Sequence, residues 1–110
     1  MTIQEWKPRL INKTKNIIAI ASYYGKAPQL RMLAEECSEL AKEALKAIRS
    51  KGDNRNALIE EMADVEIMME QNRYLWSISY EEIFKVKEEK LARQLERIRI
   101  EKENQTKIKA

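Results

Sequence analysis

The sequence predicts an all-α fold, an antiparallel bundle of about four helices built around a central acidic helical hairpin and completed by oligomerisation. Only two glycines and two prolines occur among 110 residues, while 35% of the residues are charged and 44% are hydrophobic. A chain so rich in Lys, Glu, Leu, Ile and Ala favours helix throughout. Apolar residues also recur at three- and four-residue spacing, as expected for helices that bury one face. The length fits one small domain.

The first helix is expected to end near Tyr23. The segment from Thr2 to Glu5 reads as a capping box, which marks a helix start. Pro8 complicates that start, because proline is tolerated in a first turn but removes a hydrogen bond further in. The helix therefore begins nearer Lys7 or carries a kink. Gly25 then stops the helix, and Pro28 falls in the first turn of the next one.

The next two helices are expected to form a hairpin. The second carries a regular apolar stripe from Leu30 to Ile48, and the turn falls at Ser50-Lys51-Gly52-Asp53. Gly52 can close the second helix, and Asp53 or Asn54 can cap the third. The third helix is apolar on nearly all sides, which is typical of a buried helix.

The last helix opens with a second capping box, Ser79 to Glu82, and carries Phe84, Leu91, Leu95 and Ile98 on one side. From about Arg99 the apolar stripe is lost. We therefore expect a domain over residues 1–98 and a charged, frayed C-terminal tail over residues 99–110.

Four acids of the hairpin are expected to converge. In an antiparallel hairpin, facing residues have a constant sum of residue numbers. Glu36 and Asp64 add to 100, and so do Glu39 and Glu61, with the midpoint at Ser50 in the turn. Within each helix the two acids are three apart and share a face.

Such a cluster needs a compensating cation, because burying like charges together costs several kcal/mol per ion. Oxygen ligands suit hard ions such as Mg²⁺ or Mn²⁺, and the chain has no His to build a zinc or di-iron site. The alternative is an ordinary solvated acidic face. The third helix argues against it, because Glu61 and Asp64 interrupt an otherwise apolar circumference.

The two acidic motifs, Glu35-Glu36-x-x-Glu39 and Glu60-Glu61-x-x-Asp64, carry a family resemblance. Over most of the chain, from about residue 24 through residue 93, the sequence resembles the MazG-like nucleoside triphosphate pyrophosphohydrolases of the all-alpha superfamily. The resemblance implies Mg²⁺-dependent hydrolysis of a nucleoside triphosphate, expected to be a dNTP, to the monophosphate and pyrophosphate. A metal-activated water would attack the α-phosphorus. The metal ligands would be Glu36, Glu39, Glu61 and Asp64.

Five further residues are candidates for catalysis or substrate binding, and each also has an alternative interpretation without a role in function. Glu35 is a candidate general base and equally a surface acid. Lys87, Lys90 and Arg93 are carried over from the resemblance as phosphate contacts, although a solvated basic face balanced by neighbouring glutamates explains them as well. Gln29 matches a family position near the nucleotide, or is an ordinary exposed residue near a helix start.

A different class of function is a helical interaction module. Phe84, Leu91 and Ile98 repeat at seven and could form a short coiled coil. A third hypothesis, a nucleic-acid binder using the basic last helix, is disfavoured by interspersed glutamates and a net charge of only +3.

Partners and location follow from composition. Apolar residues on several helix sides cannot all be covered within the chain, and relatives assemble as dimers or dimers of dimers, so a homodimer or homotetramer is expected. No apolar run is long enough to span a membrane. One cysteine and no signal-peptide core make the cytoplasm the expected compartment.

Overall fold

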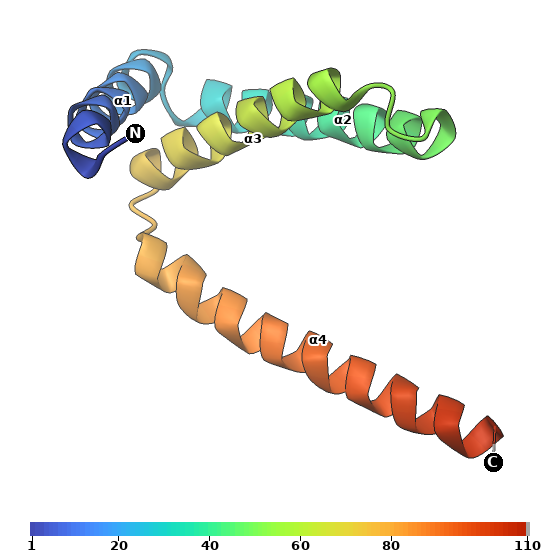
Figure 1. Cartoon of the computed structure of the whole chain (residues 1–110). Helices are drawn as coiled ribbons and strands as arrows, with labels where there is room; N and C mark the ends of the chain where they lie inside the picture. Colours follow the sequence, from blue (N-terminus) through green and yellow to red (C-terminus); the bar gives the residue numbers. More distant parts are fainter. Residues whose placement is uncertain (110) are drawn as a thin grey trace. The chain divides into compact units, whose positions relative to one another are not determined.

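A computed structural model describes residues 1–109, which form four helices: α1 (Ile3–Tyr24), α2 (Lys26–Ser50), α3 (Arg55–Leu75) and α4 (Tyr80–Lys109) (Figure 1). The prediction of an all-α chain of about four helices is confirmed, and the described residues contain no strand. The chain divides into two compact units. The first spans Met1–Ser77 and holds α1 to α3, and the second begins at Ile78 and holds α4.

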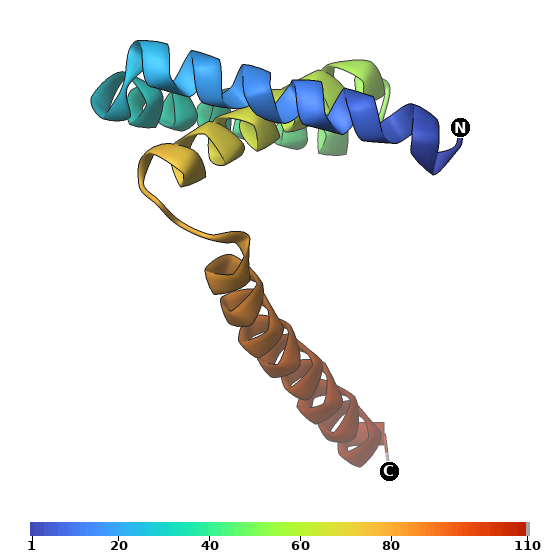
Figure 2. The ribbon, with the colours of Figure 1, turned by 90° about the vertical axis from the view of Figure 1, so that its left-hand side faces the viewer.

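The first unit is built around the hairpin of α2 and α3, which run antiparallel side by side (Figure 2). Helix α1 packs mainly on α3. Its buried Ile17 and Ala21, together with Val65 and Met68 of α3, form the apolar core. Burying these side chains supplies the main driving force for the packing of α1 on the hairpin.

The N-terminus of α1 resolves the ambiguity that Pro8 introduced. Both bonds of the capping box are present: the backbone N–H of Glu5 donates to Thr2 Oγ1 (3.3 Å), and that of Thr2 donates to Glu5 Oε2 (2.9 Å). The helix therefore starts at Ile3, and the alternative start near Lys7 is wrong. Pro8 lies inside the helix. Its missing N–H removes one backbone bond on an exposed stretch, where water can satisfy the freed carbonyl.

The turn between α2 and α3 differs in detail from the predicted one. Lys51 takes the left-handed position at the end of α2, with φ of 55°, and Gly52 after it also has a positive φ, 87°. The N–H of Gly52 donates to the carbonyl of Ala47 (3.0 Å), which closes the helix in the Schellman manner. Asn54 occupies the cap position of α3, but its amide reaches back to the backbone carbonyl (2.9 Å) and carboxylate (2.7 Å) of Glu43. It thereby ties the start of α3 to α2.

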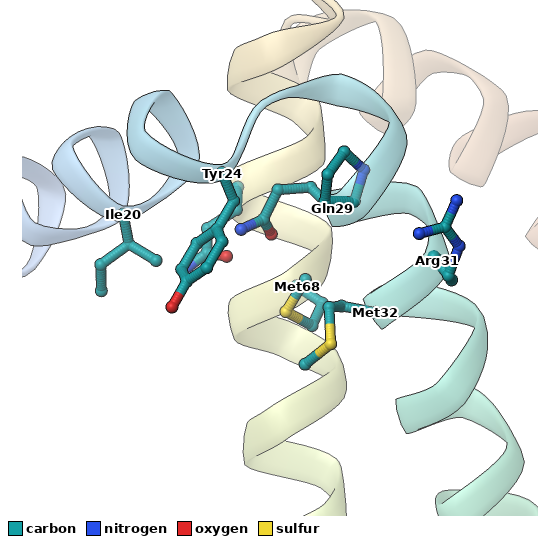
Figure 3. A pocket seen from close by; sticks show the side chains of 8 residues that line it. Ile20, Tyr24, Gln29, Arg31, Met32 and Met68 are labelled. Atoms are coloured by element: carbon teal, nitrogen blue, oxygen red, sulfur yellow. The ribbon is translucent and has the colours of Figure 1, made fainter.

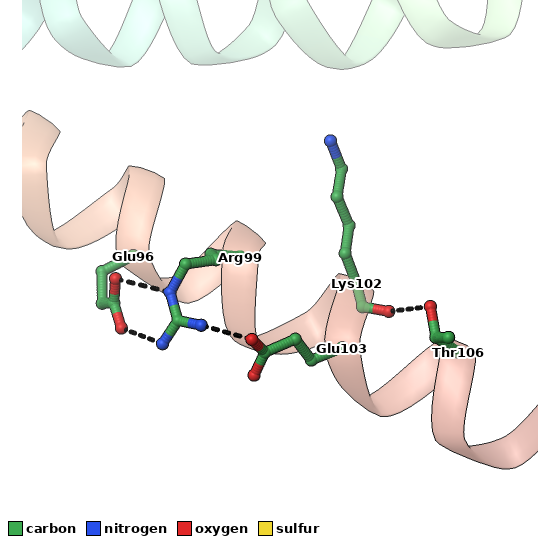
Figure 4. Close-up of polar contacts among 5 residues, drawn as sticks. All are labelled: Glu96, Arg99, Lys102, Glu103 and Thr106. Carbon is green, nitrogen blue, oxygen red and sulfur yellow. Dashed lines mark hydrogen bonds and ion pairs between the residues drawn. The ribbon is translucent and has the colours of Figure 1, made fainter.

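Helix α4 continues past the predicted boundary at Arg99 and runs through Lys109. Arg99 bonds to Glu96 and Glu103, one turn before and after it, and Thr106 donates to the carbonyl of Lys102 (Figure 4). Ion pairs at this spacing support a helix without an apolar stripe. The division between the two compact units falls after Ser77, and the domain expected over residues 1–98 stays a prediction. Ala110, the end of the predicted tail, lies outside the described residues.

The helical content of α4 is expected to depend on the charge of Glu82. Its carboxylate accepts bonds from the backbone N–H (2.7 Å) and hydroxyl (3.0 Å) of Ser79, and these bonds lower the pKa of Glu82 below its ordinary value of 4.5. Because the folded-state pKa is lowered, the capping contribution is fully present above pH 4.5. It is lost as the pH falls through the lowered pKa.

Far-UV circular dichroism between neutral pH and pH 2 measures this loss, compared with Glu82→Gln. Glutamine keeps an acceptor but does not titrate, so the variant should lack this component of the acid transition. Identical acid profiles for the two proteins would contradict the assignment.

Candidate metal centre

Three carboxylates from facing turns of α2 and α3 come together in the first unit. One carboxylate oxygen each of Glu36, Glu61 and Asp64 lies within 4.8 Å of the others. Glu36 and Glu61 are half-buried and Asp64 is exposed, so the cluster has both a packed side and an open side. The constant-sum pairing of Glu36 with Asp64 thus holds in space, and Glu61 joins them from one turn earlier on α3.

One oxygen of this cluster has no partner. Glu61 Oε2 is buried and accepts no hydrogen bond. A buried acceptor without a donor destabilises the fold, and a carboxylate oxygen more than a neutral one. This orphaned oxygen, beside two further carboxylates, fits the donor set of a hard divalent cation.

The electrostatics of the cluster favour a compensating positive charge. The pKa of Glu36 is raised above 4.5, first by burial, then by the charge of Asp64 and a hydrogen bond between the two carboxyl groups. The pKa of Glu61 is raised for the same first reason, followed by the charges of Asp64 and Glu36. Both shifts reflect the cost of ionising a carboxyl group that is partly buried and, in second place, close to other carboxylates; a bound cation would reverse both shifts.

Glu39 and Glu35, two of the predicted site residues, lie outside this three-carboxylate group. Glu39 is level with Glu61 by residue number, but its half-exposed side chain instead pairs with Lys42 (3.5 Å), three residues further along α2. Its charge still helps to raise the pKa of both Glu36 and Glu61. Glu35 is exposed and contributes to the pKa of Glu36 through its charge.

The predicted phosphate contacts belong to α4, in the second unit. Lys90 and Arg93, with Gln94 and Arg97, line a small open depression of about 190 Å³ on that helix. The Nζ atom of Lys87 lies 5.6 Å from the centre of the Tyr80 ring, in a cation–π contact. Residues at this spacing share one face of a helix and present a concentrated positive charge.

Gln29 is not the exposed residue that the alternative interpretation assumed. Only 2% of its surface is exposed, and it lines a cavity between the three helices. The sequence interpretation missed two further buried polar residues, Gln71 and Asn72 of α3. Gln71 could have been found, because it continues the row of Glu61, Asp64 and Met68 at helical spacing. Asn72 donates to the carbonyls of Gln29 (3.1 Å) and Met68 (2.8 Å), which fixes the start of α2 to α3.

Comparison with known protein families, with curated proteins and with solved structures gives no significant match. The likeness to MazG-like enzymes therefore rests on the two acidic motifs alone. Among the described residues, no helix is both long and apolar enough to cross a lipid bilayer.

Proposed function

We propose that the chain is a Mg²⁺-dependent nucleoside triphosphate pyrophosphohydrolase, with dNTPs as the expected substrates. The observation that carries the proposal is the group of Glu36, Glu61 and Asp64 carboxylates within 4.8 Å, with a buried oxygen of Glu61 that lacks a partner. A bound cation would compensate three carboxylates held this closely, two of which are half-buried. The MazG-like motifs then supply the reaction class.

The residues present fit a hard divalent ion, and Glu36, Glu61 and Asp64 would hold it. When bound, Mg²⁺ neutralises phosphate charge and increases the acidity of a water molecule. In the overall reaction the water oxygen bonds to the α-phosphorus, the bond to the bridging oxygen breaks, and pyrophosphate leaves. Glu35, next to the cluster in sequence, is the proposed general base.

Two other groups of side chains would support the reaction. Glu39 is proposed as an outer member of the site, because its charge already acts on Glu36 and Glu61. Lys87, Lys90 and Arg93 are proposed to bind the triphosphate, since cations aimed at developing phosphate charge stabilise the transition state.

Assembly into a homodimer or homotetramer in the cytoplasm is part of the proposal. Large apolar side chains are exposed on all four helices, among them Trp6, Leu45, Met62 and Leu91, each at least 48% exposed. Exposed apolar faces of this extent favour association with a second copy.

The test is pyrophosphate release from a panel of NTPs and dNTPs with Mg²⁺, with Mn²⁺ and with a chelator. The proposal predicts release that depends on the metal and favours dNTPs. Absence of release from every nucleotide, by a protein that binds Mg²⁺, would reject the enzyme and leave a binding role for the acidic site.

A specific observation also favours the second candidate, a helical interaction module. The second unit has one helix, and Leu91, Leu95 and Ile98 of that helix are 57%, 68% and 46% exposed. A solitary amphipathic helix needs a partner to bury such a face. A module of this kind would associate equally well with and without Mg²⁺, which separates it from the enzyme.

A further inference from the structure

The first unit contains a cavity whose chemistry the metal centre does not use. It has a volume of about 360 Å³ and lies where α1, α2 and α3 meet (Figure 3). This volume is at the lower end of the roughly 300–1,000 Å³ usual for small-molecule sites. Apolar side chains dominate its lining, and the polar lining residues are Gln29, Gln71 and Arg31. Besides the two glutamines, the lining residues used below are Ile20, Tyr24, Met32 and Met68.

The side-chain oxygens of two glutamines at this cavity lack partners. Gln29 and Gln71 are each only 2% exposed, and the Oε1 atom of each is buried without a hydrogen bond. Two unpaired amide oxygens at one small cavity destabilise the ligand-free protein, because each has lost water and gained no donor in return. A ligand with N–H donors on its edge would satisfy both oxygens.

The cavity and the metal centre belong to one face of the hairpin. Gln29 with Gln71, Met32 with Met68, and Glu36 with Asp64 all have residue numbers that add to 100. Each pair is therefore level across the antiparallel helices. Seven residues separate the amide pair from the carboxylate pair on each helix, a rise of about 10 Å, with the methionines between them.

The order of these three residue pairs along the hairpin limits which ligands fit. One end offers amide groups, the middle offers thioethers beside the Tyr24 ring, and the other end offers carboxylates that suit a cation. A flat heterocycle with apolar faces and a hydrogen-bonding edge fits the amide end and the middle. A metal-bound phosphate chain attached to that heterocycle would reach the carboxylate end.

We propose that this cavity binds the base of the nucleotide, with Gln29 and Gln71 accepting hydrogen bonds from its edge. This inference rests on the proposed function for the identity of the ligand. Gln71 is assigned as a specificity-determining residue, and bases that carry an edge N–H are favoured over bases that lack one. Tyr24, with Met32 and Met68, contacts the base faces.

The first arm of the test measures KM and kcat for ATP, dATP and the triphosphate of unsubstituted purine, which has no N–H donor at the corresponding edge. The base without a donor should show a KM about 10- to 100-fold higher, the effect of leaving buried acceptors unpaired. In Gln71→Leu this discrimination should shrink, and KM should rise while kcat changes little, because uniform binding has been lost.

The same variant has a second readout that a purely structural residue would not give. Replacing an orphaned buried amide with an apolar side chain of similar volume should raise the melting temperature of the ligand-free protein by about 4 °C or more. A lower melting temperature together with an unchanged KM would assign Gln71 to packing and overturn the inference.

Tyr24→Ala is the second variant, because Tyr24 is 57% exposed and its loss should leave the fold intact. Tyr74→Ala is the matched control: the Tyr74 side chain is 47% exposed and does not line the cavity. Tyr23 is unsuitable, because its ring packs edge-on against that of Tyr24, with 4.9 Å between the ring centres. In saturation-transfer NMR with free nucleosides and without metal, the base protons should receive signal from the wild-type protein. The signal should weaken in Tyr24→Ala and persist in Tyr74→Ala.

These arms separate the two proposals. Nucleoside binding that needs Gln71 and Tyr24, without any pyrophosphate release, would reject the enzyme and keep the base cavity. If pyrophosphate is released and the KM is unchanged in Gln71→Leu and Tyr24→Ala for every base, the enzyme is kept and the cavity assignment is overturned.

Discussion

Replacing Glu61 with glutamine is expected to reduce Mg²⁺-dependent pyrophosphate release by more than about 100-fold. Loss of an outer-shell group at a metal site commonly costs about 10- to 100-fold, and Glu61 is placed among the direct ligands. The substitution keeps the shape of the side chain but removes the charge of its buried, unpartnered Oε2. The measurement is the initial rate of pyrophosphate formation at saturating nucleotide.

Glu66→Gln provides the matched control. Glu66 is an exposed acid on the same helix and loses the same charge, but it lies two residues beyond Asp64, about 200° around the helix. Its variant should retain wild-type activity. Equal activity of Glu61→Gln and wild type would show that the acidic cluster takes no part in the reaction.

Mg²⁺ is expected to stabilise the protein strongly, even without nucleotide. A ligand that binds only the folded state contributes about 2.7 kcal/mol at one hundred times its Kd. For a chain of this size that corresponds to a rise in melting temperature on the order of 10 °C. The physical cause is compensation of two carboxyl groups, Glu36 and Glu61, whose pKa is raised first by burial and then by the charges of the neighbouring acids.

Thermal melts in chelator and in increasing Mg²⁺ test this expectation. The Asp64→Asn variant should melt higher than wild type in chelator, because one repelling charge is gone, and should gain much less from Mg²⁺. Glu66→Gln should respond to Mg²⁺ as wild type does. A wild-type melting temperature independent of Mg²⁺, or an equal gain in Asp64→Asn, would argue against a cation site.

The hairpin was predictable because it depends on the spacing of residues close in sequence and on the position of one turn. Helical periodicity fixes which side chains share a face, and the turn fixes which residues are level, so the pairing of Glu36 with Asp64 follows from numbering. Capping boxes at Thr2 and Ser79 were readable for the same reason, since each depends on residues three apart.

Features that depend on side-chain choice or on competition between local signals were less predictable. Glu39 lies level with Glu61, yet its rotamer takes it to Lys42. Pro8 suggested a later helix start, but the capping box outweighs one lost backbone bond. Helical spacing places Gln71 in one row with Glu61, Asp64 and Met68, but how deeply it is buried depends on how α1 packs on the hairpin, which local periodicity does not contain.

The tail beyond Arg99 illustrates another limit of apolar periodicity. The loss of an apolar stripe in this segment suggested that the helix ends there. Helix α4 is nevertheless continuous, and Arg99 forms ion pairs with Glu96 and Glu103 along it. A helix that is stabilised by ion pairs between its own side chains has no apolar stripe from which it could be predicted.

The most direct test of the account is hydrolysis of a dNTP in ¹⁸O-labelled water with Mg²⁺, followed by mass analysis of both products. Attack on the α-phosphorus predicts one ¹⁸O atom in the nucleoside monophosphate and none in pyrophosphate. Label in pyrophosphate, or formation of the diphosphate and inorganic phosphate, would contradict the proposed reaction.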